Sequence, residues 1–349
     1  MMMRNRIVIA GAGAIGASIA YHLALLGARD VVLADRAEIA SGATGKAMGG
    51  FRQQFSTEAE VRLAQESGAL FRELGSSLFD PVGYLFLATT AEGWERLRER
   101  AALQESLGVP VEEVDASRVV GLRTDDVHGA VACWEDGVAE PADVTRELVR
   151  RAADLGVDVL EQTDARELER DVLVIACGAA SPELHDALPI RPLCRQLVDV
   201  GPVANLPGDL PMTVEDETTF HFRRRDDTLR LAMTESSPRW TSDQVVDDEL
   251  VEDWRARLAH RYPPAAGAPI VRSWAGLYDM TPDAHPIIGW VEDGVYAACG
   301  FSGHGFMQSP AVGKSVAQEL LRGEPELDLS PYRLDRFGGE AVFPETVVL

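Results

Sequence analysis

Residues 6–16, Arg-Ile-Val-Ile-Ala-Gly-Ala-Gly-Ala-Ile-Gly, and residues 31–35, Val-Val-Leu-Ala-Asp, decide the fold of this chain. The first stretch predicts a buried strand that runs into a Gly-x-Gly-x-x-Gly turn, and an apolar helix follows it. The second stretch predicts another strand, and its final acid, Asp35, follows Gly16 by 19 positions. In dinucleotide-binding βαβ units, an acid about 20 residues after such a turn holds a ribose hydroxyl. The pattern therefore predicts a dinucleotide site near the start of the chain.

Each glycine of the turn has a separate physical role. Gly11 permits the tight turn out of the strand, Gly13 leaves room for a pyrophosphate to approach the backbone, and Gly16 lets the helix pack closely on the strand. The helix begins near Ala14 and Ile15, where free N–H groups and the positive end of the helix dipole face the phosphates. A glycine-rich turn alone also occurs in ordinary βα connections, but here the strand, the helix and the acid all fall in place.

The acid narrows the choice of dinucleotide. Arg36 follows Asp35 directly in the sequence. The 2′-phosphate of NADP would lie next to the carboxylate of Asp35 and be repelled by its negative charge. This disfavours NADP and leaves NAD or the ADP half of FAD as the expected ligand.

The overall composition sets limits on the class of protein. The chain has 349 residues, 46% of them hydrophobic and 26% charged, which indicates a globular protein of about two domains. No apolar run approaches the roughly 20 residues of a membrane span. The formal net charge of −23 disfavours nucleic acid and anionic membranes as partners. The four cysteines show no CxxC or zinc spacing, so we expect no metal site and a reducing, cytoplasmic location.

Periodicity along the chain predicts alternating strands and helices with a sheet-rich middle. The predicted strands are 83–89, 157–160, 171–178 and 295–299, with an antiparallel sheet between 195 and 233. The predicted helices are 57–74, 91–107, 140–156, 243–261 and 310–321. Because α/β segments lie at both ends and sheet-like segments lie between them, two interleaved domains are expected.

A second glycine-rich loop follows the predicted strand 295–299. Residues 299–306 read Cys-Gly-Phe-Ser-Gly-His-Gly-Phe and lead into a helix. Such a loop presents backbone N–H groups and a positive dipole end to an anion. A reduced flavin carries negative charge on its pyrimidine edge, so the loop suits a flavin. A second phosphate loop or a plain glycine-rich connector would show the same pattern.

With these motifs the chain resembles the FAD-dependent D-amino acid oxidase-like family. The resemblance rests on the first glycine turn, on residues 41–55, on residues 281–289 (Thr-Pro-Asp-Ala-His-Pro-Ile-Ile-Gly) and on the second glycine loop. It covers essentially the whole chain. The most similar branch contains glycine oxidase, sarcosine oxidase and the flavin (beta) subunits of heteromeric sarcosine oxidase and proline dehydrogenase.

The resemblance implies an α/β (α+β) fold, in which a Rossmann-like FAD-binding domain is interleaved with an antiparallel-sheet substrate domain. We expect the FAD-binding domain to comprise residues 1–80, 130–190 and 270–349, and the substrate domain to comprise 81–129 and 191–269. Compared with the family, the segment between residues 160 and 171 is short.

The resemblance also implies which residues contact the cofactor. They are Gly11, Gly13, Ala14, Ile15, Gly16, Asp35, Arg36, Ser41, Thr44, Lys46, Gly49, Gly50, Gly178, Gly300, Ser302, Gly303, His304, Gly305 and Phe306. Some relatives attach the flavin covalently through a cysteine or a histidine. In this chain those positions correspond to Gly276 and Lys46, so we expect non-covalent FAD.

The implied reaction is hydride transfer from a C–H next to an amine nitrogen to flavin N5, followed by hydrolysis of the imine. A bidentate arginine best anchors an amino-acid carboxylate, and Arg52 is the leading candidate, although an arginine here could instead lie on the surface or contact the flavin. Tyr278 stands where D-amino acid and glycine oxidases carry an arginine, and it could equally be a core aromatic. His304 could act through its side chain or only through its backbone. Arg230 aligns loosely with a lysine that activates oxygen in sarcosine oxidase.

The expected function is therefore FAD-dependent oxidation of an amino acid or a secondary or N-methyl amine, with O2 or another electron acceptor. Two alternatives stay open from the residues. One is a flavin subunit of a heteromeric amine or proline dehydrogenase complex, and the other is an NAD-dependent dehydrogenase. A homo-oligomer or a partner subunit is compatible with either enzyme reading.

Overall fold

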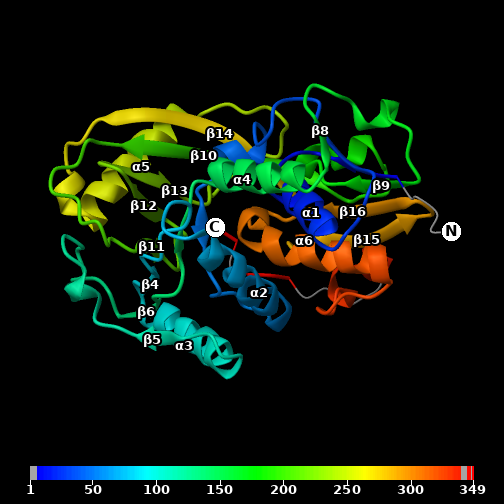
Figure 1. Ribbon diagram of the computed structural model, residues 1–349. Helices are drawn as coiled ribbons and strands as arrows, with labels where there is room; N and C mark the ends of the chain where they lie inside the picture. Colours follow the sequence, from blue (N-terminus) through cyan, green and yellow to red (C-terminus); the bar gives the residue numbers. More distant parts are fainter. Residues whose placement is uncertain (1–5, 339–343, 347) are drawn as a thin grey trace.

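The computed structural model describes residues 6–338, 344–346 and 348–349, and it contains two large sheets that lie side by side (Figure 1). A six-stranded sheet has the order β15-β16-β9-β1-β2-β8, and an eight-stranded sheet has the order β14-β10-β13-β12-β11-β4-β6-β5. A short pair, β3 (Gly50–Phe51) with β7 (Gly137–Val138), completes the strands of the described residues. The mixed α/β fold predicted from the sequence is confirmed.

The six-stranded sheet is parallel except for one edge. Its strands are β1 (Ile7–Ala10), β2 (Val31–Ala34), β8 (Asp158–Leu160), β9 (Val172–Ile175), β15 (Ile287–Glu292) and β16 (Val295–Cys299), and only β15 runs antiparallel to its neighbour. Because side chains alternate along a strand, β1 faces two cores. Ile7 and Ile9 pack against helices on one face of the sheet. Val8 and Ala10 belong to a smaller hydrophobic core, which also contains Ala165, Leu188 and Ile190.

Four helices share the larger core of this sheet. They are α1 (Ala14–Leu25), α2 (Glu58–Leu74), α4 (Pro141–Asp154) and α6 (Gly305–Arg322). Among the helices of the described residues, none is both long and apolar enough to cross a membrane.

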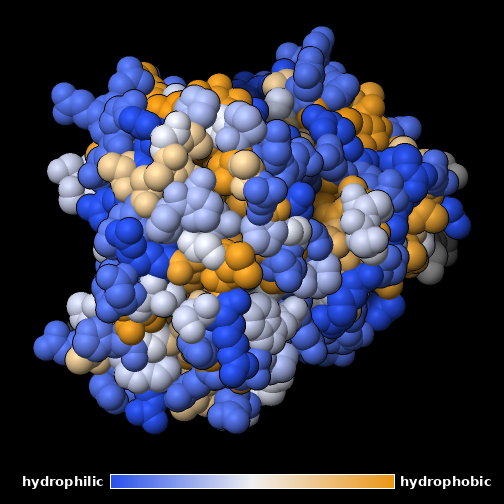
Figure 2. Space-filling view, turned by 90° about the vertical axis from the view of Figure 1, so that its left-hand side faces the viewer, coloured by the Kyte–Doolittle hydropathy of each residue, from blue (hydrophilic) through white to orange (hydrophobic). Residues whose placement is uncertain are grey.

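The eight-stranded sheet is antiparallel except where β11 pairs with β4. Its strands are β4 (Tyr84–Ala88), β5 (Val111–Glu113), β6 (Gly129–Cys133), β10 (Arg191–Val200), β11 (Met212–Glu215), β12 (His221–Arg225), β13 (Thr228–Ala232) and β14 (Ile270–Met280). Helix α5 (Asp248–Arg261) packs on β13, and α3 (Ala91–Ser106) packs on β4 and β6. Figure 2 shows this end of the molecule as mainly hydrophilic, with hydrophobic side chains gathered in several separate patches.

Two helices begin five residues away from their predicted starts. Helix α5 begins at Asp248 rather than 243, because the Asp247 side chain accepts hydrogen bonds from the N–H groups of Glu249 and Leu250 and caps the helix there. Helix α6 begins at Gly305 rather than 310, so a proline lies inside it. The prediction treated that proline as a helix start; in the structure the Ser309 hydroxyl donates to the Phe306 carbonyl, which the proline cannot bond.

Both sheets are assembled from interleaved segments of the chain, but two strands lie on the other side of the predicted division. Strand β6 pairs with β4 in the eight-stranded sheet, although residues 130–190 were assigned to the FAD-binding domain. Strand β14 pairs with β10 along nearly its whole length, although residues 270–349 had the same assignment. Their alternating or glycine-containing patterns do not reveal which sheet they join, since pairing depends on distant partners.

Candidate active site

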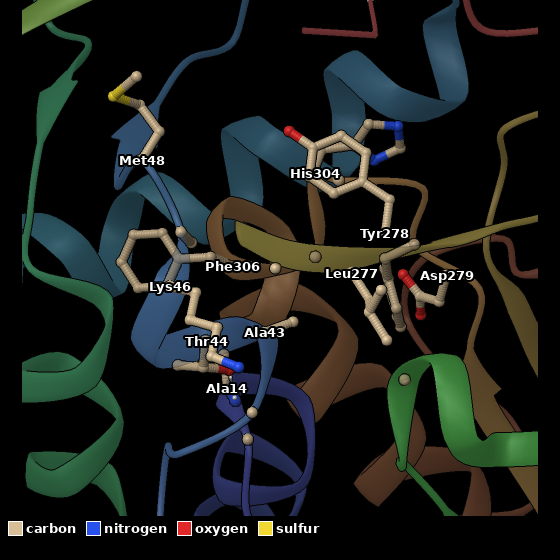
Figure 3. Close-up of a pocket in the computed structure, with 18 of the residues that line it drawn as sticks. Ala14, Ala43, Thr44, Lys46, Met48, Leu277, Tyr278, Asp279, His304 and Phe306 are labelled. Atoms are coloured by element: carbon tan, nitrogen blue, oxygen red, sulfur yellow. Dashed lines mark hydrogen bonds between the residues drawn. The ribbon is translucent and has the colours of Figure 1, made fainter. Parts of the chain in front are cut away.

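A long cavity runs from the carboxyl ends of the six-stranded sheet to one face of the eight-stranded sheet (Figure 3). It contains about 1900 Å³ of empty space, part of it open to solvent. Counted as room for the centres of water-sized molecules, its volume is about 350 Å³, within the roughly 300–1,000 Å³ of pockets for drug-sized ligands. In Figure 3, Ala14 and Thr44 lie near one end, and Tyr278 and His304 lie near the other.

Most of the predicted site residues line this cavity. They are Gly11, Gly13, Ala14, Ile15, Asp35, Thr44, Lys46, Gly49, Gly50, Arg52, Gly178, Tyr278, Gly303, His304, Gly305 and Phe306. Six others lie off its wall: Gly16, Arg36, Ser41, Arg230, Gly300 and Ser302.

The end of the cavity at β1 and α1 is built from backbone that only glycine allows. Gly11 has a φ of +106°, and a Cβ there would lie 2.4 Å from the carbonyl oxygen of Ala176. A Cβ on Gly16 would lie 1.8 Å from the carbonyl oxygen of Gly11. Gly13 precedes the first turn of α1 and provides no side-chain cap, which leaves this helix end accessible to a ligand. The cradle therefore fits a pyrophosphate.

Two side chains support this cradle. The Asp35 carboxylate lines the cavity and accepts hydrogen bonds from the N–H groups of Ala12 at 2.7 Å and Ala37 at 2.8 Å. The Thr44 hydroxyl accepts from the N–H of Ala14 at 3.0 Å. The acid thus lies at the end of β2, beside the first glycine turn, where a ribose would bind.

Arg36 and Ser41 lie near this end but face elsewhere. Arg36 forms an ion pair of 2.7 Å with Glu183 on the surface, and Ser41 donates to the carbonyl of Glu38 at 2.6 Å. Their predicted cofactor contacts stay predictions.

The second glycine loop is tied to strand β14. The N–H of Gly300 donates to the Asp279 carboxylate at 2.8 Å, and the N–H of Ser302 donates to the Asp279 carbonyl at 3.3 Å. Burial raises the pKa of Asp279, and these backbone N–H groups act against the rise. Gly303 has a φ of +101°, and a Cβ there would lie 2.3 Å from the Tyr278 ring. Gly300 and Ser302 therefore brace the loop, while the following residues line the cavity.

The positions where relatives attach flavin are neighbours in space. A Cβ on Gly276 would lie 3.1 Å from the Cβ of Lys46. Two cysteines, Cys177 and Cys299, also line the cavity. Burial raises the pKa of Cys177 to about 12 and that of Cys299 well above its usual value, so both stay protonated thiols and poor nucleophiles. These features support non-covalent binding, which stays a prediction.

Polar side chains gather at the far end of the cavity, which we call the substrate chamber. It is lined by Arg52, Tyr84, Arg195, His221, Tyr278 and His304. Sequence reasoning missed Tyr84, Arg195 and His221. No motif marks them: Tyr84 and His221 begin strands β4 and β12, and Arg195 lies inside β10. The Tyr278 hydroxyl donates to a main-chain oxygen of Leu349 at 2.6 Å, and Leu349 also lines the cavity, because the end of the chain lies in the middle of the molecule (Figure 1).

Arg52 lies in the wall of the chamber and is held on several sides. Arg52 is 1% exposed. Its guanidinium carbon lies 4.0 Å from the centre of the Phe55 ring, and its Nη1 donates a hydrogen bond to the Gln54 carbonyl. Burial lowers the pKa of Arg52, and the negative charge of Glu345 acts against this. Arg52 is thus brought to the chamber, as predicted, but as part of the surrounding structure.

His304 is held by a buried chain of polar groups. His285 Nδ1 lies 2.6 Å from Glu60 Oε1, Gln308 Nε2 donates to Glu60, and Gln308 Oε1 lies 3.3 Å from His304 Nδ1. Burial alone would raise the pKa of Glu60, but the hydrogen bonds from His285 and Gln308 lower it. We refer to Glu60, His285, His304 and Gln308 as the buried relay.

The buried relay determines the tautomer of His304. An ionised Glu60 only accepts hydrogen bonds, so Gln308 turns its amide nitrogen toward it and its oxygen toward His304. His304 Nδ1 must then carry the proton. Burial lowers the pKa of His304, so the ring is neutral near pH 7. Its Nε2 is buried, has no hydrogen-bond partner among the described residues, and is left as an acceptor.

Arg230 is not brought to the cavity. Its guanidinium forms ion pairs with Asp199 at 2.9 Å and with Glu140 at 3.5 Å, and the residue is 3% exposed. Arg223 and Arg272 pair with the same two acids. A role for Arg230 at the flavin stays a prediction that this geometry does not favour.

A βαβ dinucleotide unit, a glycine loop after a parallel strand and a polar chamber on an antiparallel sheet together define a flavin-dependent oxidoreductase. The chain belongs to the DAO family, FAD dependent oxidoreductases, whose family model matches residues 6–319. This confirms the predicted family and FAD as the cofactor of the dinucleotide site.

The chain is similar to several known members of this kind. The structure of L-proline dehydrogenase from P. horikoshii matches with a TM-score of 0.89 and 28% identity, over 96% of this chain and 98% of that one. Glycine oxidase of Geobacillus kaustophilus is 28% identical over 97% of this chain and 99% of its own length. Human mitochondrial sarcosine dehydrogenase is 23% identical over 95% of this chain, but only 41% of its own length is covered.

Proposed function

We propose that this FAD-dependent enzyme oxidises the C–N bond of an amino acid or a secondary amine. The bound FAD supplies the hydride acceptor, flavin N5, and the imine product is hydrolysed by water. The observation that carries the proposal is the continuity of one cavity from the glycine cradle to the substrate chamber. The names of the relatives, glycine oxidase, sarcosine dehydrogenase and L-proline dehydrogenase, support the same substrate class.

The charges of the chamber suit an anionic substrate group. Two guanidinium groups, Arg52 and Arg195, line it, and each can present paired N–H donors to a carboxylate. Both charges act to lower the pKa of Tyr278, which burial raises, so the two arginines and the tyrosine share one electrostatic environment. A zwitterionic amino acid would place its carboxylate here.

The neutral His304 suits the nitrogen of the substrate. Hydride transfer requires an uncharged amine, because the nitrogen lone pair must stabilise the developing cation. Nε2 of His304 is an acceptor that can receive an N–H of the substrate amine, and the buried relay keeps that nitrogen unprotonated. The substrate would then bind with its carboxylate at the arginines and its amine toward His304.

A reductive screen tests the proposal. Purified yellow protein is mixed with glycine, sarcosine, L-proline and D-alanine, and with the matched amines methylamine, dimethylamine, pyrrolidine and ethylamine. Loss of the flavin absorbance near 450 nm without oxygen reports transfer of the hydride, and turnover is then compared with oxygen and with a dye acceptor. Bleaching by at least one amino acid is expected. Protein that holds FAD but is reduced by none of these compounds would contradict the proposed substrate class.

A further inference from the structure

Arg195 is a buried arginine that forms no ion pair within the part of the chain that the structure describes. It lies in the middle of β10 and is 8% exposed. Its Nε and Nη1 atoms are buried and have no hydrogen-bond partner among the described residues. Burying a charged group without partners is strongly unfavourable, so folded proteins rarely tolerate it outside functional sites.

The other arginines near the chamber differ in this respect. Arg52 donates to a backbone carbonyl and lies against Phe55, with Glu345 acting on its charge. Arg230 forms ion pairs with Asp199 and Glu140. Of these three buried guanidinium groups, only that of Arg195 has no acceptor in the part of the chain that the structure describes.

The neighbours of Arg195 make room for a ligand. The residue opposite it on β14 is Gly276, which lines the cavity and places no side chain in it; a Cβ there would lie 3.1 Å from the Cβ of Lys46. The Arg195 guanidinium carbon lies 5.9 Å from the centre of the Tyr278 ring, two residues further along the same strand. Burial lowers the pKa of His221, and the charges of Arg52 and Arg195 lower it further, so His221 faces this cation as a neutral ring.

We propose that Arg195 binds the carboxylate of the substrate, so that the enzyme selects amino acids over simple amines. The inference rests on the proposed function and transfers to Arg195 the role that the sequence favoured for Arg52. Arg195 lines the cavity, and the two terminal nitrogens of a guanidinium, Nη1 and Nη2, can hold a carboxylate through two parallel hydrogen bonds. The phosphates of FAD do not compete for it, since their cradle lies at the opposite end of the cavity, at Gly13.

Specificity follows from the missing anion. An amine without a carboxylate would enter the chamber and leave the guanidinium unpaired, which penalises its binding. The carboxylate of an amino acid would form a charge-assisted hydrogen bond with the Arg195 guanidinium and so compensate for the water that this group has lost on burial. Arg195 would therefore discriminate by requiring a carboxylate, independently of the side chain of the substrate.

The test is a ligand titration that needs no turnover. Acetate and its neutral isostere acetamide are added to the FAD-loaded protein, and the flavin difference spectrum gives the dissociation constant of each. In Arg195→Met the dissociation constant of acetate is expected to rise by roughly 30-fold or more, the usual loss when one partner of a buried charge pair is removed. That of acetamide should change little. Arg195→Lys, which keeps the charge, should recover part of the acetate affinity.

Arg191→Met is the matched control, because Arg191 lies on the same strand, is exposed, and rests 4.4 Å from the Trp240 ring outside the chamber. Unchanged acetate affinity in Arg195→Met would overturn the inference. Loss of bound FAD, or an altered flavin spectrum in the absence of ligand, would also overturn it, because Arg195 would then contact the cofactor. If Arg195→Met does not fold, Arg195→Lys is decisive: affinity equal to the wild type for both ligands would refute a bidentate contact. Failure of the reductive screen with intact acetate binding would instead reject only the proposed reaction.

Discussion

The two ends of the cavity differ in the groups that line them: one is lined mainly by main-chain atoms and the other by side chains. The cradle at Gly11, Gly13 and Gly16 consists of main chain, and its shape depends on side chains that are absent. The substrate chamber consists of large polar side chains, such as Arg195 and His304, that come from strands and loops far apart in the sequence. The first is a local motif in the sequence, whereas the second exists only after the eight-stranded sheet has formed.

This difference has a physical cause. A strand, a glycine turn and a helix are neighbours along the chain, so short-range sterics and hydrogen bonds are enough to place them. Arg195 and Tyr278 meet because β10 pairs with β14 over some ten residues, and that register depends on long-range packing. We therefore expect changes in the cradle to abolish cofactor binding, and changes in the chamber to alter affinity, stability or pH response while FAD stays bound.

The largest effect is expected from Gly13→Val. A Cβ at this position would already lie 3.1 Å from the Thr44 hydroxyl, and the branched side chain would occupy the approach of the pyrophosphate. The variant should purify with at most about a tenth of the wild-type flavin, measured as the ratio of absorbance at 450 nm to 280 nm. Gly208→Ala, in a surface turn where a Cβ meets nothing closer than 4.0 Å, is the control. Normal flavin content in Gly13→Val would show that the cradle is not the phosphate site.

A chemical test addresses how the cofactor is held along the cavity between the two ends. Because Gly276 and Lys46 occupy the attachment positions of covalent relatives, acid precipitation should release all of the flavin. The yellow colour should appear in the supernatant after trichloroacetic acid treatment and centrifugation. Colour that stays in the pellet, together with a mass increase of the intact chain, would mean a covalent bond to another residue of the cavity.

Glu60→Gln tests the support behind the chamber. It removes a fully buried carboxylate that accepts from His285 and Gln308, and breaking such a buried pair should lower the free energy of unfolding by about 3 kcal/mol. Urea unfolding of the FAD-loaded protein measures this change. Glu58→Gln, on the exposed side of the same helix, should have little effect. A stability equal to that of the wild type would mean that the buried relay does not hold His304.

The effect that is smallest near neutral pH, where it disappears, is the pH dependence of stability contributed by His221. Burial lowers its pKa from 6.5 to about 4. Between these values the unfolded chain binds a proton that the folded protein does not, so stability falls as the pH decreases from 6.5 to 4. At about 1.36 kcal/mol per pKa unit, the loss approaches about 3 kcal/mol.

His221→Asn should remove this part of the pH dependence, because the amide can still donate to the Thr219 carbonyl that His221 Nδ1 contacts at 2.6 Å. The measurement is the free energy of unfolding at several pH values between 4 and 7, and it should flatten relative to the wild type. The exposed His128→Asn is the control. An unchanged slope would mean that His221 is protonated in the folded chamber.

Much of the fold was predictable from the sequence, and the reasons are local. The strand at Val295–Cys299 was predicted with its bounds, since a wholly apolar run between polar segments indicates a buried strand. Helix α3 was predicted within one residue, because Thr90 caps it and its charged face is exposed. The start of α6 was misplaced because a proline usually marks the first turn of a helix, whereas here it lies inside one.

The chamber was predictable only in part. Tyr278 and His304 stood beside recognisable motifs, and both line the cavity. Arg195 and His221 stood in no motif, and no local signal shows that one arginine of many would be left without an acid. Arg230 illustrates the reverse problem, because its neighbour Asp199 lies 31 residues earlier in the chain and pairs with it only through the register of β10 and β13.

The separation between main-chain cradle and side-chain chamber also bears on how such enzymes diversify. An exchange at Arg195 or His221 replaces one side chain on a strand whose ladder hydrogen bonds stay intact, so a new substrate preference is within reach of one or two codon changes. A Cβ at Gly11 would lie 2.4 Å from a carbonyl oxygen, and a Cβ at Gly16 would lie 1.8 Å from one. Any substitution at either glycine therefore disrupts the backbone of the cradle. In proteins with this architecture, single substitutions can therefore change the preferred amine, whereas the FAD-binding cradle tolerates few changes.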